Sequence, residues 1–247
     1  MEPVPQTKSM SAGWIAFLVI VLLSAVIVIV GVTVFQVRYV SVTGNYHVSA
    51  YKVLSLAGLQ NGGFFFAVNE DKVRKGVESN LYLVLESLEK NPPDSVTIHV
   101  RERTEAAYLS YQNANYLLDT QGFVLNRSGA DAVPVPLQLR GMTVRSIQVG
   151  STVVSGSSQQ LIAFQTIAEE LRIQNMLDLF SEINVTDVKN IYLVTVDNRV
   201  ATLGTCEDIR AKLLTLGGVM QYVSSYGLQP GSLDVSQPGY CTYTPNY

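Results

Sequence analysis

The chain has 247 residues, and its 17 Lys and Arg residues against 20 Asp and Glu residues leave a formal net charge of -3. The basic residues are scattered and form no stripe, which argues against nucleic-acid binding. Two cysteines, Cys206 and Cys241, are too few for a disulfide framework, and the sequence leaves open whether they pair.

The most informative feature is an uncharged run from Ser9 to Val37. Its apolar centre, Trp14 to Phe35, would extend about 33 Å as a helix, which matches the hydrocarbon thickness of a bilayer. A cleaved signal sequence is the alternative, but its apolar region spans only ~7 to 15 residues and ends at a small-x-small site. We therefore predict an uncleaved transmembrane helix over 13–36, preceded by a short cytoplasmic leader at 1–12.

Charge does not decide the orientation of this helix. Lys8 precedes it and Arg38 and Lys52 follow it, so the basic residues are nearly balanced. A short leader ahead of a long folded segment favours a cytoplasmic N-terminus and an exported body. The roughly 210 residues after the helix are enough for two domains of ~100 residues each.

The first part of the exported body follows the order strand, helix, helix, strand, strand. Alternating apolar residues indicate the strands, and cap residues or glycine mark the helix ends. The predicted elements are a strand at 39–43, a helix from Ser49 to Gly58, a helix capped by Asn69, a strand near Leu83–Leu88, a turn at 91–94 and a strand at 96–100.

The second part reads as a mixed β-domain with two helices. A hairpin is predicted at its start, and Val133–Leu137 reads as an extended edge or a loop because it contains two prolines. The predicted strands of this part are 106–111, 116–119, 123–125, 183–185, 191–196, 200–203 and, last, 233–235. The predicted helices are 157–172 and a second helix that follows a capping box at Thr205–Asp208 and ends at Gly227.

Several segments, in this order, resemble the FtsQ/DivIB cell-division family. They are Val40–Asn45, Leu59–Val68, Val96–Arg103, the D-x-x-G-x-V segment from Asp119 to Val124, and Gly231–Val235. The resemblance implies an α+β protein with a transmembrane helix, a small POTRA-like βααββ domain at 37–104, a mixed β-domain at 105–240 with two packing helices, and a tail at 241–247.

The resemblance also implies a function. Such a protein would be a single-pass scaffold in the cell membrane at the division septum, binding FtsB/DivIC-like and FtsL-like partners through its extracytoplasmic domains. It would be no enzyme and would need no cofactor and no small-molecule substrate. The alternative is a POTRA-bearing envelope protein for translocation or assembly, but those proteins usually carry several POTRA repeats or a membrane barrel, and no internal repeat is found.

The last predicted strand is the candidate partner site. A strand added last can lie at a sheet edge, where unpaired backbone groups offer a template for another chain. In the FtsQ/DivIB family this end of the β-domain receives a segment of FtsB/DivIC by strand addition, and the resemblance implies the same here. The alternative is an ordinary edge strand, blunted by Pro238 and Pro245. The predicted partner-binding residues are Ser232, Leu233, Asp234, Val235, Ser236, Tyr240 and Tyr243.

Catalytic and metal sites have little support. His47 and His99 are the only histidines, and no nucleophile motif accompanies them. Glu102 and Glu105 flank arginines, which favours a solvated ion-pair cluster over a catalytic carboxylate pair. No metal-ligand spacing is present. The triplet Phe64–Phe66 is expected to supply one or two rings to a small core, with a partner-binding patch as the alternative.

Overall fold

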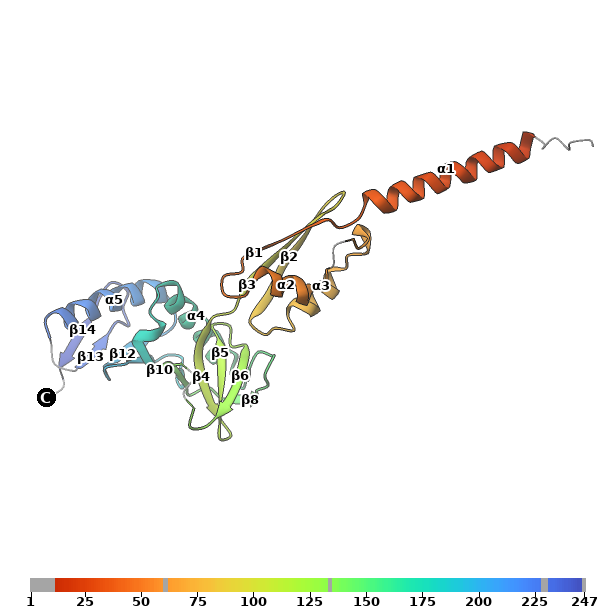
Figure 1. Ribbon diagram of the computed structural model, residues 1–247. Helices are drawn as coiled ribbons and strands as arrows, with labels where there is room; N and C mark the ends of the chain where they lie inside the picture. Colours follow the sequence, from red (N-terminus) through yellow and green to blue (C-terminus); the bar gives the residue numbers. More distant parts are fainter. Residues whose placement is uncertain (1–11, 60–61, 133–134, 228–230, 246–247) are drawn as a thin grey trace, which may run out of the picture. The chain divides into compact units, whose positions relative to one another are not determined.

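The computed structural model describes residues 12–59, 62–132, 135–227 and 231–245, and the chain divides into two compact units, Met1–Glu102 and Arg103–Tyr247 (Figure 1). The predicted leader therefore lies, up to residue 11, outside the described residues. Val133 and Pro134, part of the segment expected to be an edge or a loop, also lie outside them.

The first unit begins with helix α1, Ala12–Val34, which has 23 residues and no buried side chain. Its length and composition are sufficient to cross a membrane. Its hydroxyl groups are satisfied within the helix, since Ser24 Oγ donates to Val21 O at 2.8 Å and Thr33 Oγ1 to Ile29 O at 2.9 Å. The helix is suited to an apolar solvent throughout.

A small α/β body follows α1. Its elements are β1 Tyr39–Thr43, α2 Ala50–Ala57, the short 3-10 helix η1 Phe65–Ala67, α3 Glu70–Val77, β2 Leu83–Asn91 and β3 Ser95–Glu102. The strands form a sheet of order β1-β3-β2, in which β1 is parallel to β3 and β2 is antiparallel to it. The predicted βααββ order is confirmed.

Local signals set the helix ends in this body. Ser49 Oγ accepts from Lys52 N at 3.3 Å and Asn69 Oδ1 accepts from Lys72 N at 3.1 Å, so both predicted N-caps are confirmed. Gly58 ends α2 with φ 65°, the left-handed conformation in which glycine carries no penalty.

The core of this body lies between the helices and one face of the sheet. Val73 and Val77 of α3 and Ile98 of β3 are buried, and the Phe65 ring, only 2% exposed, fills the end of the core. Gly76 permits the close approach of the two helices, because a Cβ there would lie 2.1 Å from the backbone oxygen of Leu56. One ring of the Phe64–Phe66 triplet therefore serves the core.

The second unit is built on a nine-stranded mixed sheet of order β14-β13-β12-β11-β10-β7-β4-β5-β6. A separate two-stranded ribbon joins β8 and β9. The strands are β4 Glu105–Tyr111, β5 Ala114–Asp119, β6 Val124–Gly129, β7 Gln138–Arg140, β8 Val144–Ser146, β9 Val154–Ser155, β10 Phe180–Asn184, β11 Ile191–Thr195, β12 Val200–Gly204, β13 Gly231–Asp234 and β14 Thr242–Pro245.

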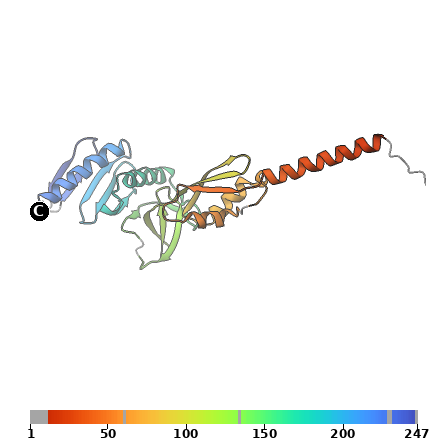
Figure 2. The ribbon, with the colours of Figure 1, turned by 45° about the horizontal axis from the view of Figure 1, so that its top comes forward.

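Two helices pack on this sheet, α4 Ser158–Ile173 and α5 Ile209–Ser225. They contact each other, and Figure 2 shows α5 lying along the strands at the C-terminal end of the sheet. Phe164 and Leu171 of α4 and Leu213 and Leu216 of α5 enter the same core, all 0% exposed. The predicted α+β class with two packing helices is confirmed.

The capping box predicted at Thr205 does not start α5. The helix begins four residues later at Ile209, after Asp208, which has φ 50°. The carbonyl of Thr205 is used by Lys212 instead, whose ammonium donates to Leu203 O at 3.0 Å and to Thr205 O at 2.9 Å. Lys212 is 3% exposed and ties the first turns of α5 to the end of β12.

Candidate partner-binding site

The strand predicted to lie at the edge of the second unit lies inside the sheet. Leu233 of β13 pairs with Ala201 of β12 on one side and with Tyr243 of β14 on the other (Figure 1). Leu233 and Val235 are 0% exposed and belong to the core. The expectation that 233–235 forms the edge is therefore wrong, because the proline- and tyrosine-containing tail adds one more strand outside it.

The other predicted partner-binding residues fall in three environments. Ser232 and Asp234 alternate with the buried positions of β13 and so lie on the sheet face away from the core, with Asp234 exposed. Ser236 and Tyr240 lie in the exposed connection to β14, and the Tyr240 side chain is 73% exposed. Tyr243 is half-buried and packs against the core.

The nine-stranded sheet has two end strands, β6 and β14, and the one next to β13 is β14, Thr242–Pro245. Among the described residues no strand pairs with its outer side. Thr242 and Thr244 lie opposite Asp234 and Ser232 in the antiparallel register, so the face beside this edge carries short polar side chains. Such a border leaves the backbone of β14 open to an incoming strand.

A glycine and an aromatic ring hold β14 in place. A Cβ at Gly231 would lie 2.4 Å from Thr244 O and 2.6 Å from Cε2 of Tyr243, so only glycine fits under this ring. The Tyr243 ring thus covers the glycine of the neighbouring strand. Gly231, Thr242 and Thr244 shape the edge and were not among the residues predicted from the sequence, since the position of β14 was not foreseen.

The two cysteines are separate thiols. Cys206 and Cys241 are both free and half-buried. Burial, together with the neighbouring Asp234 carboxylate, raises the pKa of the Cys241 thiol. Cys241 is consequently a weakly reactive thiol directly beside β14.

In the first unit, Glu102 organises the loop after β1. Its Oε1 accepts from Tyr46 N and Val48 N, both at 2.8 Å, and from His47 N at 3.0 Å, while its Oε2 lies 3.0 Å from Nδ1 of His47. Burial would by itself raise the pKa of this carboxyl, but the backbone donors and the His47 ring outweigh it and lower the pKa to about 2. Glu102 is therefore a structural cap, and its oxygens are already occupied.

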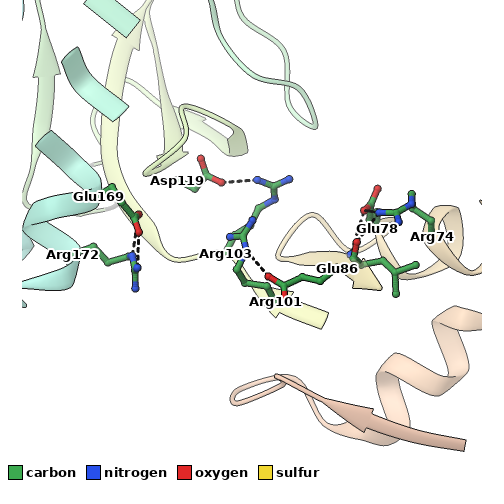
Figure 3. Close-up of polar contacts among 9 residues, drawn as sticks. Arg74, Glu78, Glu86, Arg101, Arg103, Asp119, Glu169 and Arg172 are labelled. Carbon is green, nitrogen blue, oxygen red and sulfur yellow. Dashed lines mark hydrogen bonds and ion pairs between the residues drawn. The ribbon is translucent and has the colours of Figure 1, made fainter. Parts of the chain in front are cut away.

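The neighbouring arginines have separate partners (Figure 3). Arg101 Nε lies 3.3 Å from Glu86 Oε1, and Arg103 Nη1 donates to Asp119 Oδ2 at 2.6 Å. The side chains of Arg103 and Asp119 are 16% and 3% exposed, so the expectation of a solvated ion pair is wrong for Arg103, whereas Arg101 and Glu86 are half-exposed. Arg101 belongs to β3 and pairs with Glu86 of the neighbouring strand β2, whereas Arg103 lies beyond the end of β3 and pairs with Asp119 of β5.

Asp119 also shapes its own turn in the D-x-x-G segment. Its Oδ1 accepts from Gln121 N and Phe123 N, both at 2.8 Å, and Gly122 has φ 72°. The Arg103 guanidinium lies 3.8 Å from the centre of the Phe123 ring. The buried Asp119 side chain thus stabilises this turn of the second unit.

Both histidines contact neighbouring side chains of the first unit. His47 is tied to Glu102, and Nδ1 of His99 lies 2.7 Å from Thr43 Oγ1 across the sheet. Within the described ranges, no group of three or more His, Cys, Asp or Glu side chains could hold a metal ion. The sheet edge at β14 remains the best candidate for a functional site.

Comparison with known proteins places these features in context. Residues 35–103 match a family model described as a POTRA domain of the FtsQ type. The cell division protein DivIB of Clostridium acetobutylicum is 22% identical over 187 residues, covering 72% of this chain and 71% of that protein. DivIB of Geobacillus kaustophilus is 32% identical over 98 residues, covering 40% of this chain and 38% of that protein.

Among solved structures, the chain is similar to the major extracytoplasmic domain of the trans isomer of the bacterial cell division protein DivIB from Geobacillus stearothermophilus. It aligns with a TM-score of 0.33 at 15% identity, over 50% of this chain and 96% of that domain.

Proposed function

The chain belongs to the FtsQ/DivIB family and carries an FtsQ-type POTRA domain, and from this premise we propose that it is a scaffold of the bacterial division complex that binds partners through β14. The family consists of non-enzymatic division proteins, so the prediction that the chain is not an enzyme is confirmed. The partners in the proposal are an FtsB/DivIC-like chain and an FtsL-like chain at the septum.

The observation that carries the proposal is the outer side of β14, with which no strand of the described residues pairs. Strand addition uses main-chain hydrogen bonds for affinity and flanking side chains for specificity. Tyr240, 73% exposed beside the edge, offers an aromatic contact, and Ser232 and Asp234 flank it on the open face. The buried Leu233 and Val235 support the edge from the core and do not touch the partner.

We also propose that the chain is anchored in the cell membrane. Helix α1 spans the cell membrane once, with a cytoplasmic N-terminus and both units outside. Anchoring in the same membrane raises the effective concentration of small single-pass partners, so an edge of only four residues suffices for association. A role in translocation or assembly is less well supported, because the second unit is a nine-stranded mixed sheet and not a further βααββ unit.

Site-specific photo-crosslinking in cells tests the site without disturbing the fold. A crosslinking residue replaces Thr244 on β14, and the matched control replaces Asn126, an exposed residue of β6 at the other end of the same sheet. The expected result is a covalent adduct with an FtsB/DivIC-like chain from position 244 only. Equal capture from both positions, or capture from neither, would overturn the assignment to β14.

A truncation gives an independent test of the same edge. A chain that stops after Cys241 lacks β14 but keeps Leu233 and Val235 in the core. It should lose co-purification of the partner from membranes, while circular dichroism verifies that the rest of the sheet is retained. Undiminished co-purification from a folded truncated chain would exclude β14 as the binding edge.

A further inference from the structure

An aromatic cluster lies where α1 meets the POTRA unit. We name Phe35, Phe64 and Phe66 the juxtamembrane aromatic cluster. The Phe66 ring centre is 5.0 Å from that of Phe35 and 5.6 Å from that of Phe64. Phe64 and Phe66 remain 45% and 60% exposed, whereas Phe65 between them fills the core. About half of each outer ring therefore lies outside the POTRA core, and the Phe66 ring also contacts the core ring of Phe65, with ring centres 5.4 Å apart.

Backbone hydrogen bonds attach this cluster to the end of α1. Phe65 N donates to Phe35 O at 2.9 Å, Val37 N to Gly63 O at 2.8 Å, and Gly62 N to Val37 O at 2.8 Å. Phe35 N donates to Gly31 O at 3.0 Å, so Phe35 continues the last turn of the helix. The Gly62–Phe66 segment is thus held beside the residues that directly follow the membrane-spanning helix.

The depth of the cluster follows from the length of α1. A helix of 23 residues spans about 35 Å, slightly more than the ~30 Å hydrocarbon core, so its last residue reaches the lipid headgroups. Phe35 is the next residue, so the Phe66 ring that contacts it, and the Phe64 ring that contacts Phe66, lie at nearly the same depth. Exposed phenyl rings at this depth gain by leaving water for lipid.

The charge pattern around the cluster permits this contact. No charged residue occurs between Gly62 and Val68, and the charge that reaches the end of this segment is the Lys90 ammonium, which donates to Val68 O and suits a headgroup region. The first charged residue after α1 is Arg38, whose Nη2 donates to Thr33 O at 3.1 Å. A guanidinium at the end of a membrane helix reaches the headgroup region with its charged end.

We propose that the juxtamembrane aromatic cluster inserts into the bilayer interface beside α1, so that the POTRA unit contacts lipid directly through Phe64 and Phe66. Lipid is the proposed binding partner because the cluster directly follows the helix that enters the bilayer. The proposal rests on α1 spanning the membrane, as in the proposed function, but it goes further. The POTRA unit then has a second attachment to the membrane besides its chain connection to α1.

Tryptophan fluorescence in the full chain, reconstituted in phosphatidylethanolamine and phosphatidylglycerol nanodiscs, tests this contact. Trp14 is the sole tryptophan of the chain, so a Trp14→Phe background makes an introduced tryptophan the only reporter. Phe66→Trp is the test variant. Tyr46→Trp is the matched control, since Tyr46 is 88% exposed and follows β1 at the end opposite to α1.

The expected result is a blue-shifted emission for Phe66→Trp that is largely lost when the acyl chains carry bromine. Tyr46→Trp should keep the emission of a tryptophan in water, with or without brominated lipid. Emission from Phe66→Trp that matches the control would overturn the proposal, and so would a blue shift without quenching, because the ring would then be covered by protein. Trp14 in the unaltered chain separately reports whether α1 lies in lipid, so failure of the anchor and failure of the cluster are distinguishable.

Discussion

Glu102→Gln is expected to destabilise the POTRA unit strongly, although it changes only one group. The carboxyl has a pKa of about 2 in the folded chain against 4.5 as its ordinary value, a difference of about 2.5 units. At ~1.4 kcal/mol per unit this corresponds to about 3 kcal/mol, with the side chain only 12% exposed. Glutamine keeps one acceptor oxygen but no charge, so we expect the free energy of unfolding of the POTRA unit to fall by ~1–3 kcal/mol at pH 7.

The lowered pKa of Glu102 also makes the stability of the POTRA unit depend on pH. Because the folded pKa lies below the unfolded one, the stabilisation is fully present above about pH 4.5 and is lost as the pH falls through about 2. In the unaltered chain the POTRA unit should therefore weaken between these two values. The Glu102→Gln variant should lack this contribution at every pH and change less across the same window.

Hydrogen exchange of peptides from residues 39–102 measures the opening free energy of this unit separately from the second unit. The matched control is Glu86→Gln, because Glu86 is 53% exposed and pairs with Arg101 at the surface. An exposed ion pair of this kind contributes ~1 kcal/mol or less. If both variants lower the opening free energy equally, the backbone cap at Tyr46–Val48 is not what Glu102 contributes.

Three other perturbations probe the second unit and the helix packing. Lys212→Met leaves the buried carbonyl of Leu203 and the partly buried carbonyl of Thr205 without their donor. It should lower the free energy of unfolding in urea by ~1–3 kcal/mol, against almost no effect for Lys189→Met at an exposed position. Gly76→Ala should lower the opening free energy of the POTRA unit, measured by hydrogen exchange, by ~1–3 kcal/mol. Alanine favours a helix, but its Cβ would meet the backbone oxygen of Leu56. A gain in stability would show that the two helices can move apart. Cys241 should react with maleimide at pH 7 more slowly than a cysteine introduced by Tyr240→Cys, and its rate should rise with pH, since its thiol pKa is raised; equal rates would contradict this.

Local signals in the sequence were sufficient for the elements of the POTRA unit. The caps at Ser49 and Asn69 and the stop at Gly58 each act within a few residues, so the printed sequence contains the whole interaction. The alternation in β3 likewise requires only that one face of the strand is buried. The apolar run of α1 needs no tertiary context at all.

Short elements and pairing partners were not predictable in this way. β7 has three residues, too few for a periodic pattern, yet it joins β4 to β10 in parallel pairs. The capping box predicted at Thr205 does not start α5, which begins at Ile209, and the Thr205 carbonyl accepts a hydrogen bond from Lys212. The candidate partner-binding strand was expected at the edge of the sheet, but β13 lies between β12 and β14, and β14 is the end strand.

The sequence by itself determined the long apolar helix, the βααββ order and the two amphipathic helices, because each depends on neighbours along the chain. The tertiary structure decided which strand is the edge, where Glu102 places its carboxylate and which rings of Phe64–Phe66 stay exposed. Those features depend on contacts between residues far apart in sequence. Periodicity indicates which face of an element is buried, but it does not indicate what lies against that face.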